Sequence, residues 1–451
     1  MPKQLALAFP RKNFFLEMFT RDISLEDCVL DLIDNSIDSL VRTRNIVISA
    51  HLLDSDFNPS SDLENGSFPT IHVTFSTRAC KVVDTCGGIS REAALTDVFN
   101  FGHSKRGASG YLGAYGIGLK RALFKIGNHF KIESKTAHEG FTAELDLNKW
   151  AAHDTDMTDW TIPLKFIPGA KSLSKAGTSI TISELRQEVL MRLASGAFEK
   201  ILRDQIAQAY ALFIDRYVKI SLNGKAIHPN PIPLAQSSEL EPGKEEFEDD
   251  DVKVTLLAGL AVRNLKGEWV HERAGWYVLC NGRVVVPADR TDLTGWGEAS
   301  PLFHYKYRGF CGVAFFQSDD PLALPWDTTK RGLNQESPVY QRAKRRMSGL
   351  ARPVLSFLNR MYPSEPAAEL QERRLAEEIK PVDIRTALTK ATSTFRPPIQ
   401  ATQKARTVMV QFKAKIEDVD RIRKFLRQPS WGASKIGEHT FNHFLKTEIA
   451  E

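Results

Sequence analysis

The sequence has little of what marks a secreted, disulfide-bonded or membrane-spanning protein. Its five cysteines are scattered and form no CxxC pair, so neither a disulfide framework nor a zinc site is predicted. No apolar run reaches the roughly 20 residues that a membrane-spanning helix needs. The N-terminus has basic residues, only a short broken apolar stretch and no small-residue cleavage site. We therefore expect a cytoplasmic protein without a membrane contact.

Length and composition indicate a globular chain of more than one domain. The chain has 451 residues, of which 42% are hydrophobic and 25% are charged. A single hydrophobic core seldom grows beyond about 250–300 residues, so two large domains and a smaller tail are expected. The formal net charge of +5 is modest for this length and does not by itself indicate a nucleic-acid-binding protein.

The first part of the chain alternates helical and strand patterns. Residues 24–42 place apolar side chains on one helical stripe, and Ser24 is a favourable N-cap. Residues 70–76 alternate strictly between apolar and polar, and the next apolar run ends at Asp84, which predicts a hairpin.

A glycine-rich segment follows over residues 99–118. It precedes a helix that begins near Leu119, and further strands are expected over residues 129–146 and 161–183. These alternating elements predict an α/β sandwich over residues 1–190.

Further strand and helix patterns predict a second α+β domain over residues 191–362. Its helical stretches are residues 195–215 and 336–360, and its strand-like runs are ISLNGKAI, VTLLAGLAVR, GWYVLCNGRVVV and GFCGVAFF. Residues 237–251 are acidic and poor in apolar side chains, which predicts a solvated loop. Residues 363–451 should form a helical, basic C-terminal region that includes a Pro/Thr-rich link near residues 391–402.

One side of the first predicted helix concentrates negative charge. At about 100° per residue, Asp31, Asp34, Asn35 and Asp38 fall within one arc, with Asp27 one turn earlier. Carboxylates four residues apart repel one another by about 0.2–0.5 kcal/mol per pair. The face therefore needs a cation, hydrogen-bond donors or plain solvent, and a solvated acidic face is the simplest interpretation of this helix alone.

Two glycine motifs follow this helix. In VVDTCGGI, Asp84 stands at a strand end before Gly87 and Gly88, and its carboxylate can accept from an exocyclic amine. In YLGAYGIGLKRA, the glycines precede a helix start whose backbone amides can bind an anion, with positive charge added by Lys120 and Arg121. Each motif alone is common in turns.

Together these strings resemble the nucleotide-binding boxes of a known superfamily. DLIDNSIDS, DTCGGI and GAYGIGLK are similar to those of the GHKL ATPases, which include gyrase B, the heat-shock chaperone, MutL and MORC, and most similar to MORC-like prokaryotic members. GTSITI resembles the family's Gly-Thr strand, and PWDTTKRGLN resembles a transducer-domain loop with a switch lysine. The resemblance covers about residues 10–350 and implies an α+β fold: a Bergerat-type sandwich, then a transducer-like domain and the helical tail.

The resemblance implies an ATP site that uses magnesium. Asn35 would coordinate Mg²⁺, and an amide oxygen suits that hard cation. Asp84 would accept from the adenine amine, with support from Thr178. Lys330 would stabilise charge on the γ-phosphate, unless it is an ordinary surface lysine. Further expected nucleotide contacts are Asp38, Gly88, Ile89, Gly113, Tyr115, Gly116, Ile117 and Gly118, together with Ser104 and Lys105 in a mobile lid.

Two residues depart from the family pattern. Asp31 stands where most members have a glutamate that acts as general base, so the attacking water could sit differently and hydrolysis could be slow. Cys86 stands where the box usually has its first glycine, and we expect it to pack as a small buried hydrophobe.

Several functions and partners stay open at this point. In relatives, ATP drives dimerisation by exchange of an N-terminal segment, and FPRKNFFLEMF is either such a strap or ordinary core. The basic C-terminal region would contact DNA in an ATP-gated clamp, or would be a solvated helical face. A chaperone-like ATPase that acts on protein clients and an ATP-binding switch with little turnover are the alternatives. The cationic residues of the tail are Lys404, Arg406, Lys413, Lys415, Arg421, Arg423, Lys424 and Arg427.

Overall fold

The structure is a computed structural model of the whole chain. It describes residues 10–44, 46, 51–57, 68–102, 112–113, 115–154, 159–167, 175–237, 240–361, 379–397 and 409–449. Internal packing divides the chain into two compact units, Met1–Ala401 and Thr402–Glu451. The predicted domain boundaries near residues 190 and 362 remain predictions. The fold is α+β, as the sequence predicted.

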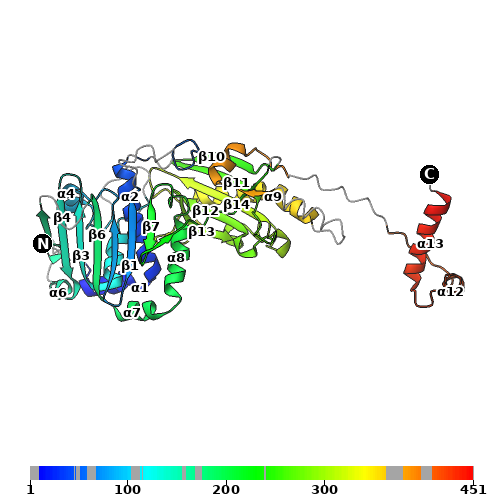
Figure 1. The fold of residues 1–451 in the computed structure, drawn as a ribbon, viewed down its shortest axis with the longest axis horizontal. Helices are drawn as coiled ribbons and strands as arrows, with labels where there is room; N and C mark the ends of the chain where they lie inside the picture. Colours follow the sequence, from blue (N-terminus) through cyan, green and yellow to red (C-terminus); the bar gives the residue numbers. More distant parts are fainter. Residues whose placement is uncertain are drawn as a thin grey trace, which may run out of the picture. The chain divides into compact units, whose positions relative to one another are not determined.

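An eight-stranded sheet forms one half of the first unit (Figure 1). Its order is β5-β4-β3-β6-β2-β1-β7-β8, and neighbouring strands are antiparallel except for the parallel pair of β1 and β7. The predicted hairpin is present, with Ile71 paired to Asp84. The strands are β1 (Thr70–Phe75), β2 (Ala79–Asp84), β3 (Gly127–Lys135), β4 (Gly140–Asp146), β5 (Leu164–Ile167), β6 (Gly177–Leu185), β7 (Lys219–Leu222) and β8 (Lys225–Ile227).

Helices α2 and α5 pack together and against this sheet. The predicted helix over residues 24–42 is α2, and Ser24 caps it by accepting a hydrogen bond of 3.1 Å from the Asp27 amide. Most of α2 is buried, including the acidic residues Glu26, Asp27, Asp31 and Asp34. The helices of this half are α1 (Lys12–Arg21), α2 (Leu25–Thr43), α4 (Arg91–Thr96), α5 (Gly118–Ile126), α6 (Leu147–Ala152), α7 (Gln187–Ala194) and α8 (Phe198–Ala209).

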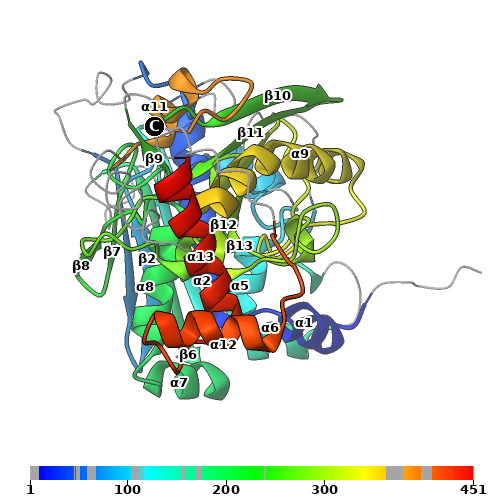
Figure 2. The ribbon, with the colours of Figure 1, turned by 90° about the vertical axis from the view of Figure 1, so that its right-hand side faces the viewer.

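A five-stranded sheet with order β10-β11-β14-β12-β13 forms the other half of the first unit. Its strands β12 and β14 are parallel neighbours and completely buried, and α9 packs on β11 and β14 (Figure 2). The elements are β10 (Gly243–Asp249), β11 (Val252–Leu260), β12 (Gly275–Cys280), β13 (Arg283–Asp289), β14 (Phe310–Gln317) and α9 (Pro338–Met361). Single 3-10 turns occupy His271–Arg273, Asp292–Thr294 and Tyr305–Tyr307.

The structure corrects two expectations about these sheets. The run ISLNGKAI forms β7 and β8, which extend the first sheet through β1 and do not belong to the second. The acidic segment is not only a solvated loop, since its second half forms the edge strand β10. Two of its carboxylates pair with arginines of α9: Arg346 contacts Glu245 and Arg342 contacts Asp249, each at 2.8 Å. Charged side chains on an edge strand also discourage unwanted strand pairing.

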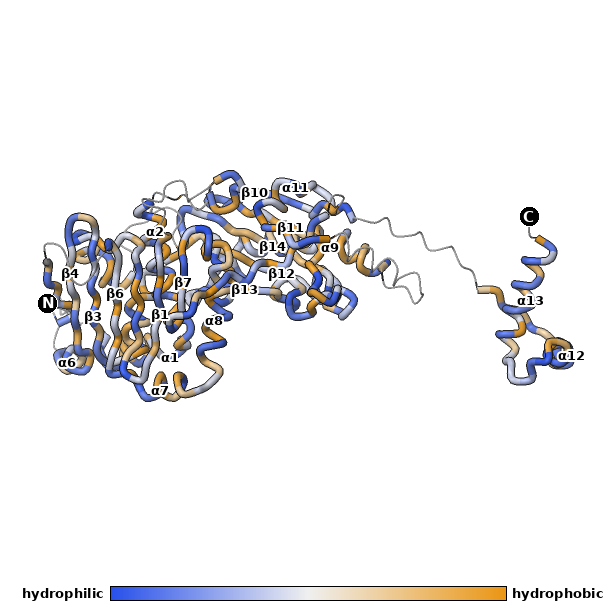
Figure 3. The backbone as a smooth tube through the Cα atoms, in the orientation of Figure 1, coloured by the Kyte–Doolittle hydropathy of each residue, from blue (hydrophilic) through white to orange (hydrophobic). Residues whose placement is uncertain are grey.

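The C-terminal part of the chain is helical where it is described. In the first unit, β15 (Lys380–Pro381) pairs with β9 (Ala235–Gln236), and α11 (Ile384–Lys390) follows. The second unit contains α12 (Ile416–Phe425) and α13 (Ala433–Glu448), along which hydrophobic and hydrophilic residues are interspersed (Figure 3). The charged helix expected after Pro363 lies outside the described residues, as do Lys404 and Arg406.

Within the parts of the chain that the structure describes, no helix is long and apolar enough to cross a bilayer.

Helix α1 packs on α5 of its own chain from Lys12 onward. The Lys12 ammonium is fully buried and donates to the carbonyls of Trp150, His153 and Asp159 at 2.9, 2.5 and 2.7 Å. This lysine therefore anchors the start of α1 on α6 and the segment after it. Exchange of an N-terminal strap stays a prediction, and the first nine residues lie outside the described ranges.

We expect Lys12→Met to lower the free energy of unfolding by about 2 kcal/mol, because three carbonyls that surround the buried ammonium would lose their donor. Chemical denaturation of the full chain measures this. Lys149→Met is the matched control: its side chain is 84% exposed and its ammonium pairs with Asp146, so a change within about 0.5 kcal/mol is expected. Equal effects of the two variants would contradict the anchoring role of Lys12.

Candidate functional site

A cavity of about 520 Å³ opens between α2, the end of β2, the start of α5 and the loop that carries Lys330. Its volume is in the range of small-molecule and cofactor sites. It brings together residues that the sequence proposed from five separate segments: Asp31, Asn35, Asp38, Asp84, Ile89, Gly113, Tyr115, Gly116, Ile117, Gly118, Thr178 and Lys330.

One other proposed residue, Gly88, is not among the described residues that line the cavity. The carbonyl of Gly88 accepts a hydrogen bond of 3.1 Å from the hydroxyl of Ser39, which itself lines the cavity. Ser104 and Lys105 lie outside the described residues.

Asp84 forms one end of the cavity and is held by three donors. Its Oδ1 atom accepts from the amides of Cys86 at 2.8 Å and Thr178 at 3.3 Å, and its Oδ2 atom accepts from the Ser36 hydroxyl at 3.0 Å. Burial raises the pKa of Asp84 to about 6, although these hydrogen bonds oppose the shift. The Thr178 hydroxyl lies 2.9 Å from the hydroxyl of Ser134, so Thr178 contacts Asp84 through its backbone.

Cys86 packs as the sequence predicted. Its side chain is buried, and burial holds the pKa of its thiol well above the usual range. A thiol in this state is an inert packing group, and the residue acts on Asp84 only through its amide.

The glycine-rich loop and the start of α5 form the opposite end. Asp38 accepts from the amides of Leu112 at 2.7 Å and Gly113 at 2.8 Å, and burial raises its pKa to about 6. The loop approaches α2 so closely that a Cβ atom on Gly113 would lie 2.8 Å from Asp38, and one on Gly118 would lie 2.9 Å from Asp31. A Cβ atom at either position would therefore displace one of these carboxylates. The first turn of α5, where a helix leaves its amides without intrahelical partners, lines the cavity.

Lys120 adds positive charge at this end. It lines the cavity, is almost completely buried and donates to the Val98 carbonyl at 3.0 Å. Burial lowers its pKa to about 8, which is still above neutral pH. The ammonium is thus available to an anion at the start of α5.

Asn35 lies between the two ends, in the middle of the cavity-lining side of α2. Its Nδ2 atom is buried and has no hydrogen-bond partner among the described residues. Buried amides nearly always have partners, so this side chain is free to present its oxygen or its nitrogen to a bound group.

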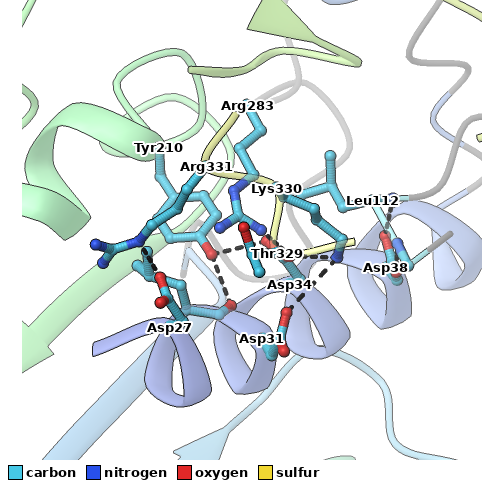
Figure 4. Close-up of polar contacts among 12 residues, drawn as sticks. Asp27, Asp31, Asp34, Asp38, Leu112, Tyr210, Arg283, Thr329, Lys330 and Arg331 are labelled. Atoms are coloured by element: carbon cyan, nitrogen blue, oxygen red, sulfur yellow. Dashed lines mark hydrogen bonds and ion pairs between the residues drawn. The ribbon is translucent and has the colours of Figure 1, made fainter. Parts of the chain in front are cut away.

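Three carboxylates on the acidic face of α2 are buried and paired with cations, whereas plain solvent was the simplest expectation (Figure 4). Asp31 pairs with Arg121 at 3.0 Å, and Asp27 forms an ion pair with Arg331. The interpretation as a solvated face is therefore wrong. An unpaired carboxylate would be costly to bury, and each of these has its own charged partner.

Asp34 is the most enclosed of these carboxylates, with 1% of its side chain exposed. The Lys330 ammonium lies 2.7 Å from its Oδ2 atom, and the Arg283 guanidinium contacts the same oxygen. The Tyr210 hydroxyl lies 2.7 Å from Oδ1 and 2.8 Å from the Leu30 carbonyl. Burial beside this negative charge holds the pKa of Tyr210 well above its usual range, so the tyrosine remains a donor.

The sequence analysis missed Tyr210, Arg283 and Arg331 as partners of this face, and it missed Ser36 of α2 as a donor to Asp84. Tyr210, Arg283 and Arg331 come from distant elements, so no local pattern indicated them. The available signal was the acidic face itself, which required donors or cations.

The loop that carries Lys330 is tightly organised. Asp327 Oδ1 accepts from the Thr329 amide at 2.9 Å, the Thr329 hydroxyl at 2.7 Å and the Arg331 amide at 3.2 Å. Lys330 has φ +55°, the left-handed region that a residue with a side chain rarely adopts. Its ammonium is not at the surface: the side chain is 6% exposed and points to Asp34 and Asp31. The alternative of an ordinary surface lysine is therefore wrong.

A comparison with protein families matches residues 23–178 to a family described as "Histidine kinase-, DNA gyrase B-, and HSP90-like ATPase". No curated protein matches the chain. The matched segment begins just before α2 and ends at Thr178 on β6, so it contains the cavity residues from Asp31 to Thr178 but not Ile180, Thr328 or Lys330. The match does not bear on the closer similarity to MORC-like members. Over residues 23–178 the chain thus matches the GHKL ATPase superfamily.

Proposed function

We propose that this chain binds ATP with Mg²⁺ and hydrolyses it in the cavity under α2. The observation that carries the proposal is the meeting of five distant sequence segments around one cavity of about 520 Å³. The cavity has a carboxylate at one end and a glycine-rich helix start with cations at the other. This polarity suits a ligand with an amine-bearing base and a polyanionic tail.

The nucleotide would lie with its adenine at Asp84 and its phosphates at the loop from Gly113 to Gly118. The carboxylate of Asp84 would accept from the exocyclic amine, and the amides of the first turn of α5 would face the phosphates. Mg²⁺, when bound, would neutralise phosphate charge, and Asn35 would hold it through its amide oxygen. Asn35 lines the cavity, and its Nδ2 atom has no partner among the described residues, so this amide is not already held through its nitrogen.

Asp31 would orient the attacking water. Arg121 holds its carboxylate at 3.0 Å, and Lys330 lies 3.8 Å away on the other oxygen. These contacts fix the position of the Asp31 carboxylate but also occupy its two oxygens, which favours slow turnover. An ATP-binding switch with little hydrolysis is the second candidate that this observation supports.

The wider proposal is an ATP-gated homodimer in the cytoplasm that acts on DNA. The support for DNA is the second unit, where Lys413, Lys415, Lys424 and Arg427 are exposed. Arg421 and Arg423 are partly neutralised by Asp418 and Asp420, which weakens the positive face. A chaperone-like ATPase with protein clients is the alternative, and retention of DNA that falls with salt separates the two.

Steady-state hydrolysis of ATP tests the catalytic assignment. Asp31→Ala should retain nucleotide binding and lose turnover by about 10²-fold or more. Asn35→Ala should weaken binding of the magnesium nucleotide by about tenfold or more. Assays with and without DNA report whether DNA stimulates the reaction. Unchanged turnover in both variants would defeat the assignment.

The pH dependence of binding tests Asp84. A carboxylate with a pKa of about 6 in the free protein is protonated below that pH, and an adenine amine favours the deprotonated form. Affinity for ADP should therefore be full near pH 8 and fall up to about tenfold as the pH drops to 5. Calorimetric titrations measure this.

Asp84→Asn should remove the part of the pH dependence that comes from the contact between Asp84 and adenine. Titration of the ADP phosphate affects the wild type and the variant equally. Asp38→Asn is the control, because Asp38 also has a pKa of about 6 but binds the glycine-rich loop. The same pH profile in wild type and Asp84→Asn would refute the role of Asp84.

Light scattering with a non-hydrolysable ATP analogue tests dimerisation. The dimer should appear with the analogue and be absent or weaker without nucleotide. A monomer under both conditions would rule out the ATP-gated clamp.

A further inference from the structure

Lys330 is held by two carboxylates of α2 while it also lines the cavity. Its ammonium lies 2.7 Å from Asp34 and 3.8 Å from Asp31, although it comes from a loop 296 residues further along the chain than Asp34. Lys330 thus has a charged partner on α2 and is also in contact with the cavity in which a ligand would lie.

The charges around Lys330 allow it to leave without exposing an unpaired carboxylate. Asp31 has Arg121 as its own cation, and Asp34 has Arg283. With Lys330 these two carboxylates have three cations between them, so the cluster carries one surplus positive charge. Departure of Lys330 leaves two neutral pairs, which avoids the large cost of a buried lone charge.

The backbone around Lys330 is fixed, so such a movement concerns the side chain. Asp327 holds the turn through the amides of Thr329 and Arg331, and Lys330 N donates to the Asp327 carbonyl at 3.1 Å. A left-handed residue in a turn with this many hydrogen bonds is over-determined by its surroundings. The long side chain of lysine can exchange one anion for another by rotamer changes alone.

We propose that Asp34 is a positioning residue that holds Lys330 on α2 when no nucleoside triphosphate is bound and competes with the γ-phosphate for its ammonium. This inference rests on the proposed function, because it needs the phosphates to lie at the glycine-rich end. Arg283 and Tyr210 keep Asp34 satisfied after the lysine leaves. The competition lowers affinity for the triphosphate and leaves affinity for the diphosphate unchanged.

Binding of a non-hydrolysable ATP analogue and of ADP, measured by calorimetry on the full chain, tests this competition. Asp34→Asn should raise the ratio of analogue affinity to ADP affinity about fivefold, because Lys330 loses its resting partner. In a Lys330→Met background the same substitution should leave the ratio unchanged. Asp27→Asn is the matched control: it removes a carboxylate of the same helix that pairs with Arg331, and the ratio should stay at the wild-type value.

Three outcomes would overturn the proposal. An equal rise with and without Lys330 would mean that the general field of the helix acts on the phosphates. A fall in the ratio would mean that Asp34 aids γ-phosphate binding, and an unchanged ratio would mean that it has no part in it. Absence of any nucleotide binding by the wild type would instead refute the proposed function itself.

Asp34→Asn leaves Arg283 without its carboxylate and could fail to fold. Arg283→Gln with Asp34→Asn removes both charges, and Arg283→Gln alone is then the reference protein. The expected rise in the ratio between these two proteins is again about fivefold, and no rise contradicts the proposal.

Discussion

The burial of the acidic side of α2 is the constraint on which the rest of this structure depends. Burying carboxylates is costly unless each is paired or hydrogen-bonded. Four parts of the chain supply the partners of these carboxylates. They are Arg121 on α5, backbone amides of the glycine-rich loop, Arg283 on β13, and the loop with Lys330 and Arg331. The helix thereby gathers segments from both sheets around one cavity.

The same interactions join the eight-stranded and five-stranded sheets electrostatically. Asp34 lies on a helix packed against the first sheet, while Arg283 opens a strand of the second. A charge that enters the cavity acts on Lys330, which lines the cavity and pairs with Asp34. The proposed ATPase and the proposed competition for Lys330 therefore have a common physical origin, which is the balance of charge at α2.

Much of the fold could be predicted because its signals are local. The helix after Ser24, the hairpin that ends at Asp84 and the helix after the glycines follow from periodicity and capping, and all are present. The acidic edge strand β10 could not be predicted, because its neutralisation comes from arginines on α9. Strands β7 and β8 were assigned to the wrong sheet, because pairing with β1 depends on chain topology.

By itself, the sequence determined which residue types were available to a nucleotide site and in what order they occur. Only the tertiary structure decided that α2 is buried, that Ser36 completes the hydrogen bonds of Asp84, and that Lys330 rests on Asp34. The reason is physical: periodicity and turn preferences act over a few residues, whereas charge compensation in a buried site joins side chains nearly 300 positions apart.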